Sequence, residues 1–480
     1  MTASLWTASA AAAAVSGRLT GRTWTASGVS IDSRTVARGD LFVALQGPTH
    51  DGHDHVAAAL AAGAAAALVH RVPEGLAADA PLLVAQDTRQ ALESLAAAAR
   101  ARSNARIVAV TGSVGKTGTK EMLKLALDTA GPTHVTAGNL NNHWGVPLSL
   151  ARLPPSARFA VFELGMNHPG EITPLTRLVR PHVAVITAVE AVHMEFFAST
   201  REIARAKAEI FLGVEPGGVA VLPRDNPHFA FLSDQARAAG ITAIEGFGRH
   251  IDADARLLDA AQDPEATLVF ALLGDEAMSY RVGVPGLQWG INSLAVLLAA
   301  RASGLAPATA APALAAMTAP KGRGARKRLP WGDGGLLVID ESYNASPASM
   351  RAAIATLAQT ERPRQARRIA VLGDMLELGE ASPSVHAGLA ETLVERGIDL
   401  VFTAGALMRH LHDALPVDRR GGHAANADAA ALLLAGALAA GDVVMVKGSA
   451  GSAMGRVITK LEDLAAASLP PAGRDQGEKP

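Results

Sequence analysis

One segment limits the possible folds more than any other, because a strand, a glycine loop and a helix follow one another within residues 106–130. RIVAV (106–110) is short and rich in β-branched residues, and KEMLKLALDTA (120–130) has apolar residues at helical spacing. The loop between them, TGSVGKTGT, lets backbone N–H groups close on phosphate oxygens, and the positive N-terminus of the helix faces the same anion. The segment therefore predicts an α/β fold that binds a nucleotide.

This loop departs from the common phosphate-loop pattern G-x-x-x-x-G-K-[ST], because Val110 stands where that pattern has glycine. Lys116 would still reach the β- and γ-phosphates, and the Thr117 hydroxyl would help to hold Mg²⁺. A glycine turn beside an exposed lysine is the alternative interpretation. The predicted nucleotide contacts are Gly112, Ser113, Gly115, Lys116, Thr117, Gly118 and Thr119.

Three later runs have the composition of strands covered on both faces: FAVFEL (159–164), HVAVITAV (182–189) and GGVAVL (217–222). Strands that alternate with helical segments predict a doubly wound, mostly parallel sheet with helices on both faces. Similar α/β patterns occur before residue 90, and again after a basic, Pro- and Gly-containing stretch near 312–330.

A length of 480 residues suits about three domains. We predict a small N-terminal α/β domain (1–90), a central P-loop ATPase-like domain (91–317) and a C-terminal Rossmann-like domain (318–466), all of the α/β class. The end of the chain (467–480) is rich in Pro, Gly and charged residues and is expected to be a disordered tail.

Charge and cysteine content exclude several classes of partner. The formal net charge is −1, from 44 basic and 45 acidic residues, so nothing indicates binding to nucleic acid or to an anionic membrane. Cysteine is absent, which excludes disulfides, thiolate metal sites and a cysteine nucleophile. The Ala-rich start reads as a first helix, since it lacks the basic region of a secretory signal. We expect a cytoplasmic monomer without stable membrane insertion.

Polar residues follow two of the predicted strands. Glu163 lies near the C-terminal end of FAVFEL, and His193 follows HVAVITAV, so both would face the sheet edge at which open α/β sheets bind ligands. A carboxylate beside a triphosphate suits Mg²⁺, which prefers oxygen donors. An ordinary polar strand end and a structural histidine are the alternatives.

A third group of polar residues lies in GNLNNHWGVPLSL (138–150), which contains Asn139, Asn141 and Asn142. Such amide clusters either satisfy the backbone of their own loop or hold a polar substrate, and the sequence leaves both open.

Five segments in the same order resemble the Mur ligase family: TGSVGKTGTKE, GNLNNHWGVPLSL, FELGMNHPGEI, the stretch from HMEFF to AKAEIF, and DESYNASP. SIDSRTVARGDLFVALQG followed by DGHDHV is similar to the family's UDP-sugar-binding domain, and the matching segments span about residues 29–458. The missing first glycine of the phosphate loop is itself a family trait. Within the family, YNASP (343–347) favours the activity that joins D-Ala-D-Ala to UDP-N-acetylmuramoyl-tripeptide over the one that adds the third amino acid.

The resemblance implies a cytoplasmic step of peptidoglycan precursor synthesis. The substrate carboxylate attacks the γ-phosphate of ATP, and the acyl phosphate is captured by an amine. Because two anions meet in the first step, cations must lower its barrier. The implied catalytic residues are Lys116, His193, Lys207 and Arg323, and the implied ligands of two Mg²⁺ ions are Thr117, Glu163, His193 and Lys207.

Further roles are implied in the same way. Lys207 is expected to be carbamylated, which requires a neutral amine and hence a desolvated side chain, and a surface lysine is the alternative. Nucleotide contacts are expected from Asn292 (adenine), Arg323 (γ-phosphate), Asp340 (ribose) and Tyr343. Substrate contacts are expected from Ser33, Arg34, Asn139, Asn141, Asn142, Asn344 and Lys447.

Two positions depart from the family pattern. Gln288 stands where histidine is frequent, and Ala453 where a basic residue is frequent, so contacts to adenine and to substrate are expected to differ there. A related ligase that adds another amino acid or a polyglutamate tail is the nearest alternative. A P-loop kinase, a nucleotide-gated regulator and an inactive relative are alternatives of other classes.

Overall fold

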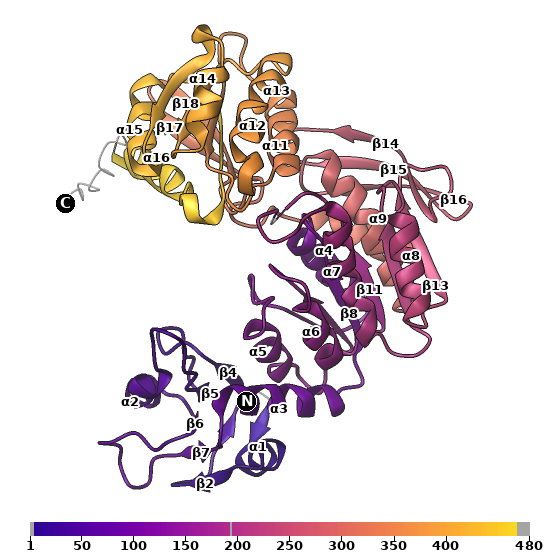
Figure 1. Ribbon diagram of the computed structural model, residues 1–480, viewed down its shortest axis with the longest axis vertical. Coiled ribbons are helices and arrows are strands. Elements are labelled where there is room, and N and C mark those ends of the chain that lie inside the picture. Colours follow the sequence, from indigo (N-terminus) through magenta and orange to yellow (C-terminus); the bar gives the residue numbers. More distant parts are fainter. Residues whose placement is uncertain (1–3, 193, 468–480) are drawn as a thin grey trace, which may run out of the picture.

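The computed structural model describes residues 4–192 and 194–467, and these form three large sheets in chain order and one two-stranded sheet near the N-terminus. Figure 1 shows the N-terminal sheet at one end, the central sheet in the middle and the C-terminal sheet at the other end. The sheets fall within the three predicted domain ranges, and the expected α/β class is confirmed. The domain boundaries stay predictions, and most of the expected disordered tail lies outside the described residues. Among the described residues, no helix has both the length and the apolar character needed to cross a bilayer.

The N-terminal sheet has five strands in the order β2-β7-β6-β5-β4, and all its pairs are parallel except β2–β7. Its strands are β2 (Arg18–Thr20), β4 (Gly28–Ser30), β5 (Asp40–Val43), β6 (Ala66–Val69) and β7 (Leu82–Val84). Around it lie α1 (Ala8–Val15), α2 (Val56–Ala61) and α3 (Thr88–Ala101), with the short antiparallel pair β1 (Trp6–Thr7) and β3 (Thr25–Ala26). Helix α3 runs across the predicted 90/91 boundary.

The central sheet has nine strands in the order β16-β15-β14-β13-β12-β11-β8-β10-β9. Pairing is parallel from β9 to β14 and antiparallel from β14 to β16. The strands are β8 (Arg106–Thr111), β9 (Thr133–Val135), β10 (Phe159–Glu163), β11 (Val183–Ile186), β12 (Val219–Pro223), β13 (Ala243–Gly248), β14 (Ala255–Gln262), β15 (Thr267–Leu273) and β16 (Glu276–Val282). The helices are α4 (Lys116–Asp128), α5 (Gly145–Ala151), α6 (Ile172–Val179), α7 (Thr200–Ala208), α8 (Phe229–Ala238), α9 (Leu287–Ala302) and α10 (Pro307–Ala310).

The C-terminal sheet has six strands in the order β17-β18-β22-β19-β20-β21, parallel except for the β17–β18 pair. The strands are β17 (Ala325–Trp331), β18 (Gly334–Glu341), β19 (Arg368–Gly373), β20 (Leu400–Ala404), β21 (Arg420–Ala424) and β22 (Val443–Lys447). The helices are α11 (Pro347–Gln359), α12 (Ser382–Ala387), α13 (Leu389–Glu395), α14 (Met408–Ala414), α15 (Ala427–Ala437) and α16 (Gly455–Ala467). Ser346 begins α11 with a reciprocal capping box, and Pro347 fits the first helical position.

Helices cover both faces of the central sheet, as its strand composition predicts. Val108 and Val110 of β8 pack into a core shared with α4 and α9, whereas Ile107 and Ala109 pack into a second core shared with α5 to α8. Because side chains alternate between the faces of a strand, an almost continuous apolar run is what such a two-sided strand requires.

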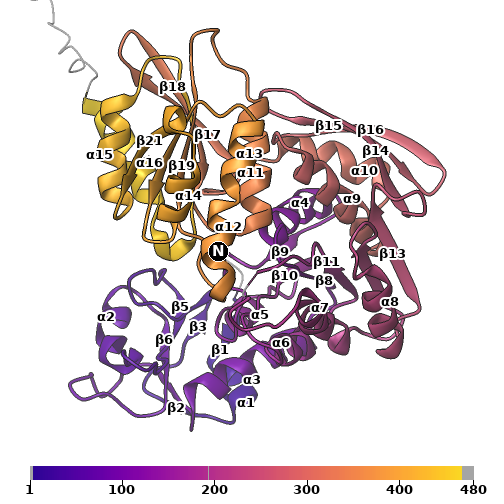
Figure 2. The same cartoon turned by 45° about the horizontal axis from the view of Figure 1, so that its top comes forward.

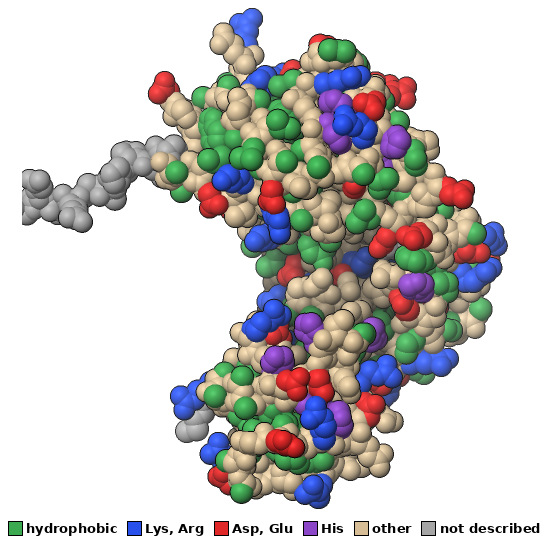
Figure 3. All heavy atoms as spheres, turned by 60° about the vertical axis from the view of Figure 1, so that its left-hand side comes forward, with side chains coloured by type: hydrophobic (Ala, Val, Ile, Leu, Met, Phe, Trp, Pro, Cys, Tyr) green, Lys and Arg blue, Asp and Glu red, His purple; other side chains and the backbone are tan. Residues whose placement is uncertain are grey.

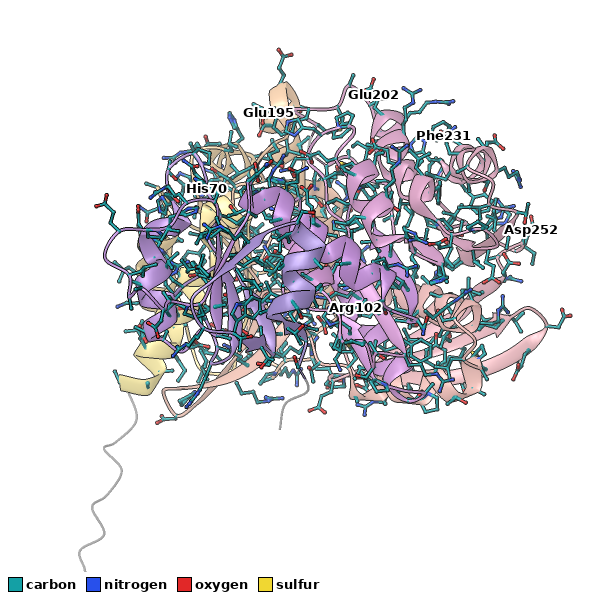
Figure 4. The ribbon with its side chains drawn as sticks, turned by 90° about the horizontal axis from the view of Figure 1, so that it is seen from below. His70, Arg102, Glu195, Glu202, Phe231 and Asp252 are labelled. Carbon is teal, nitrogen blue, oxygen red and sulfur yellow. The ribbon has the colours of Figure 1, made fainter. Side chains whose placement is uncertain are left out.

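The N-terminal sheet is attached to the central one by contacts around α5. Trp6 Nε1 donates to the Ala151 carbonyl at 2.9 Å, and Arg152 Nε donates to the Val29 carbonyl at 2.6 Å. The guanidinium of Arg102, which is labelled in Figure 4, lies 3.9 Å from the centre of the Trp6 ring. Hydrogen bonds from side chains to backbone carbonyls and a cation–π contact therefore lie at the junction of the two units.

Two histidines of the central sheet make stability depend on pH. Burial lowers the pKa of His134 to about 4, and burial followed by nearby arginines lowers that of His182 to about 4 as well. The unfolded chain takes up these protons below a pH of about 6.5. The contribution of these two histidines to the free energy of unfolding is thus fully present above that pH, and it is lost as the pH falls towards 4. We expect the melting temperature to fall between about pH 7 and pH 5 for this reason.

His134→Gln tests this expectation, because glutamine can still donate to the Ser149 carbonyl, which the imidazole contacts at 2.8 Å. Thermal unfolding followed across that pH range should show a flatter dependence for the variant than for the parent chain. If the melting temperatures of the variant and the parent chain changed equally with pH, His134 would not be a source of the pH dependence.

Candidate active site

A cavity of about 900 Å³ lies between the central and C-terminal sheets. Figure 2 shows these two units meeting along one side, and Figure 3 shows a deep hollow in the surface of the molecule. Twelve residues from the sequence prediction line the cavity: Ser113, Gly115, Lys116, Gly118, Asn139, Asn141, Glu163, Asn292, Arg323, Tyr343, Asn344 and Lys447. The structure therefore brings most of the predicted site together from segments far apart in the chain.

The phosphate loop joins β8 to α4, as expected, and has two glycines at positive φ. Gly112 has φ of 150° and Gly115 has φ of 87°, and Gly115 precedes the first residue of α4. Lys116 Nζ donates to the Gly112 carbonyl at 2.7 Å, so the lysine folds back over its own loop. Burial, followed by the charge of Arg323, lowers the pKa of Lys116, while Glu163 opposes that shift. An anion in the loop would favour the charged ammonium.

Close packing explains the glycine at position 112. A Cβ atom there would lie 1.9 Å from Thr187 Oγ1 at the end of β11. Thr187 Oγ1 in turn donates to the Val114 carbonyl at 2.5 Å, which fixes the orientation of the loop backbone. Only glycine suits both this contact and the positive φ.

We expect Gly112→Ala to weaken nucleotide binding by about 10- to 100-fold, since strain of about 1–3 kcal/mol must be relieved by moving the loop. Gly170→Ala is the matched control, because Gly170 also has a positive φ, of 89°, but nothing lies within 4 Å of an added Cβ. Calorimetric titration with ADP measures the effect. Equal affinity for the two variants would contradict the packing argument.

Side-chain oxygens that could bind a metal ion lie beside the phosphate loop. Thr117 Oγ1 donates to Glu163 Oε2 at 2.9 Å, and Asn141 Nδ2 donates to Glu163 Oε1 at 2.8 Å. A hydroxyl and a carboxylate next to a phosphate site fit Mg²⁺, which takes hard oxygen ligands. Thr117 and Glu163 are thus the residues that would hold the ion, which would neutralise charge on the phosphates.

Lys207 lies on α7 and is buried, with 2% of its surface exposed. Burial, and secondarily the charge of Lys116, holds its pKa well below the usual range. Within residues 4–192 and 194–467 it makes no side-chain hydrogen bond or ion pair. It is therefore not the surface lysine of the alternative interpretation, although it does not line the cavity. His193, the other predicted ligand of the second ion, lies outside the described residues.

The linker into the C-terminal sheet carries Arg323. Its guanidinium lies 4.0 Å from the centre of the Tyr343 ring, and Gly322 accepts a hydrogen bond from the Tyr343 N–H at 3.0 Å. Asp340 is 1% exposed and does not line the cavity. Its carboxylate accepts from Gly322 N at 3.2 Å and from Ser342 Oγ at 2.6 Å, so here it holds the linker. The predicted ribose contact is untested.

Helix α9 and strand β22 complete the walls. Asn292 faces Gly115 closely enough that a Cβ on that glycine would lie 2.7 Å from its amide nitrogen. Gln288, one of the two departures from the family pattern, also lines the cavity. Lys447 ends β22 and donates to the Asn344 carbonyl at 3.0 Å, beside Glu341 Oε2 at 3.3 Å. Ala453, the other departure, has a left-handed φ of 53° and is not among the lining residues.

The remaining predicted residues do not line the cavity: Ser33, Arg34, Gly112, Thr117, Thr119 and Asn142. Arg34 forms a two-point pair with Asp32 in the turn after β4, and hydrogen bonding to Arg34 lowers the pKa of Asp32 to about 2. Asn142 Oδ1 accepts from Gly145 N at 2.9 Å, so this amide satisfies its own loop.

Sequence reasoning missed several residues of the site. Thr187, Asp225, Asn226 and Phe247 line it from strand ends, and Leu376 to Leu378 line it from the loop after β19. Thr187 lies within HVAVITAV directly after β11, and a polar residue that follows an apolar strand is the kind of signal that identified Glu163. The Ser113 hydroxyl, predicted for nucleotide, accepts from Glu190 N at 2.9 Å and so also joins two loops.

A phosphate loop at the carboxyl edge of a mostly parallel sheet, facing basic residues from a second sheet, defines a nucleotide-binding α/β enzyme of several domains. Comparisons with known proteins identify the family within this class. Three family models match: the Mur ligase family catalytic domain (25–100), the Mur ligase middle domain (110–300) and the Mur ligase glutamate ligase domain (326–450).

Individual relatives match over nearly the whole chain. The UDP-N-acetylmuramoyl-tripeptide–D-alanyl-D-alanine ligase of Escherichia coli (strain K12) is 35% identical over 451 residues, covering 94% of this chain and 96% of the relative. A crystal structure of MurF from Acinetobacter baumannii superposes with a TM-score of 0.81 at 30% identity, covering 95% and 99% of the two chains. MurF from Thermotoga maritima in complex with ADP gives a TM-score of 0.76 at 27% identity, covering 92% and 98%. The chain belongs to the Mur ligase family.

Proposed function

We propose that this chain is an ATP-dependent, ADP-forming ligase that joins D-Ala-D-Ala to UDP-N-acetylmuramoyl-tripeptide. The observation that carries the proposal is the shared cavity, in which Lys116 and Glu163 of the central sheet face Arg323 and Lys447 of the C-terminal units. Cations from both sides surround a place where two anions, a carboxylate and a triphosphate, would have to meet. The names of the relatives supply the identity of the substrates.

In the first step an oxygen of the tripeptide's terminal carboxylate attacks the γ-phosphorus of ATP. The bond from that phosphorus to the β,γ-bridging oxygen breaks, and ADP leaves. Lys116 and Arg323 offset the charge that accumulates there, and the phosphate loop orients the nucleotide. Mg²⁺ held by Thr117 and Glu163 would add further positive charge.

In the second step the amine of D-Ala-D-Ala attacks the acyl carbon. The bond from that carbon to the phosphate oxygen breaks, the nitrogen loses a proton, and an amide and inorganic phosphate result. The cavity between two sheets limits the access of water, which would otherwise hydrolyse the acyl phosphate. Asn344 and Lys447, on the C-terminal side, are proposed to face the incoming amine substrate.

Lys207 is proposed to act as a carbamate. Its lowered pKa favours the neutral amine, and a neutral amine can add to CO₂ with loss of one proton. The product is an anion that could hold a second Mg²⁺ with His193, whereas an ammonium would repel the ion. The N-terminal sheet, with Ser33 and Arg34, is proposed to bind the UDP-sugar part of the substrate.

The test measures ADP and phosphate release with each substrate omitted in turn. We expect release only when ATP, UDP-N-acetylmuramoyl-tripeptide and D-Ala-D-Ala are all present, and no product when meso-diaminopimelate replaces D-Ala-D-Ala. Turnover with another amino acid would assign a different ligase activity. A phosphorylated product, or ATP hydrolysis independent of any amine, would assign a kinase or a nucleotide-gated protein instead.

A further inference from the structure

Lys120 is a fully buried lysine that the reaction described above does not use. It lies on α4 one turn after Lys116, and 0% of its surface is exposed. Its Nζ atom donates to the Thr136 carbonyl at 2.7 Å and to the Gly138 carbonyl at 3.1 Å, and Glu121 Oε1 lies 3.0 Å away. A buried ammonium costs free energy unless its donors are paired, and these partners pair them.

Both carbonyls belong to the segment 136–144 between β9 and α5, called here the amide loop. Two of its side chains, Asn139 and Asn141, line the cavity. Asn141 also contacts the Glu163 carboxylate, and Thr136 Oγ1 accepts from the Glu163 N–H at 3.2 Å. The amide loop therefore forms the wall beside the carboxylate expected to hold Mg²⁺.

Helix α4 reaches this wall by two routes. Thr117 contacts Glu163, which contacts Asn141, while Lys120 contacts the loop backbone directly. Thr117 and Lys120 are three residues apart and so lie on the same face of the helix. The helix whose N-terminus faces the phosphates is thus also the element that holds the amide loop in place.

We propose that Lys120 is a positioning residue that fixes the amide loop relative to the phosphate loop. By holding two carbonyls on either side of residue 137, it keeps Asn139 and Asn141 directed at the tripeptide carboxylate and at the metal-binding side of the cavity. This inference rests on the proposed function. Two lysines of α4 would then have different roles. Lys116 contacts the nucleotide, whereas Lys120 positions the amide loop that faces the tripeptide substrate and the Mg²⁺ ion.

Lys120→Met tests the proposal, because methionine is of similar length and has no donor. We expect kcat/KM for the tripeptide substrate to fall by about 10- to 100-fold, the loss typical of a catalytic group misplaced by about 1 Å. The Mg²⁺ concentration for half-maximal activity should rise. ADP affinity measured without Mg²⁺, followed by the fluorescence of Trp289 against Gly118, should change by less than about twofold.

Lys124→Met is the matched control on the same helix. Lys124 is exposed and pairs with Asp128, so its loss should leave all these constants as in the parent chain. Lys120→Gln keeps a shorter donor and is expected to show a smaller rise in the tripeptide KM. If Lys120→Met does not fold, Lys120→Gln tests the proposal in its place. A raised KM for the tripeptide substrate with unchanged ADP affinity would support the positioning role of Lys120. Unchanged KM and ADP affinity would overturn it.

Two results with folded Lys120→Met would overturn the proposal. One is parental kinetics with only a lower melting temperature, which would make the lysine purely structural. The other is an equal loss of ADP affinity, which would place its effect on the phosphate loop. Failure of the parent chain to release ADP with D-Ala-D-Ala would refute the proposed function instead. Mg²⁺-dependent ADP binding would then still report on Lys120.

Discussion

Replacing Lys116 by methionine should lower kcat by about 10³-fold, which is the upper range for removing one preorganised electrostatic group from an active site. Lys116 begins α4, lines the cavity and folds back onto Gly112 over the phosphate loop. Its ammonium is placed to stabilise charge on the transferring phosphoryl group, which no neighbouring residue of α4 can replace. Single-turnover ADP formation with saturating substrates measures the chemical step directly.

The same variant should fold at least as well as the parent chain. Burial and the charge of Arg323 already lower the pKa of Lys116, so the folded protein without ligand gains little from this charge. We expect an unchanged or raised melting temperature together with the loss of activity. A strongly lowered melting temperature would mean that the kinetic loss reflects misfolding, and near-parental kcat would remove Lys116 from the mechanism.

Replacing Lys207 by alanine should reduce kcat by about 10²- to 10³-fold if its carbamate stabilises charge in the cavity. Short-chain carboxylic acids such as acetate should restore part of the activity, because they supply the missing anionic oxygens. Lys207→Arg is the matched control. It keeps a cation of similar length that cannot be carbamylated, so it should be inactive, and added acids should not restore it.

The pH dependence gives a second measurement for Lys207. As the pH falls through the lowered pKa of this amine, protonation competes with carbamate formation, and activity of the parent chain should fall. The acid-rescued alanine variant lacks that amine and should lose less activity over the same range. Near-normal activity of Lys207→Ala without any added acid would reject the carbamate.

Local patterns were sufficient for much of the fold. A two-sided apolar strand such as 106–110, followed by glycines and a helix, was enough to predict that β8 is covered on both faces and at which edge of the sheet a nucleotide is expected to bind. Glu163 followed from the same rule, because a polar residue after such a strand faces that edge. The desolvation expected of Lys207 came from the family resemblance, and its burial agrees with it.

Other features depend on contacts between distant segments, which no local pattern contains. Thr187 supports the phosphate loop from the next strand in space, and Lys120 binds carbonyls 16 and 18 residues further along the chain. The hydrogen bond from Gly322 to Asp340 was not predicted, because it depends on the register of the β17–β18 pair, in which Asp340 lies opposite Ala325. Such roles follow from strand register and helix packing, which are set only in the folded chain.

The tie between Asp340 and the Gly322 N–H has a consequence for how the molecule responds to its nucleotide. Because Gly322 immediately precedes Arg323, that hydrogen bond attaches the backbone beside Arg323 to Asp340 of strand β18 in the C-terminal sheet. The charge of Arg323 lowers the pKa of Lys116, so these two cations, which come from different units, repel each other. A polyphosphate between them reverses the sign of that interaction. We therefore expect a bound polyphosphate to hold the two units together, and high salt to weaken that attraction by screening both cations.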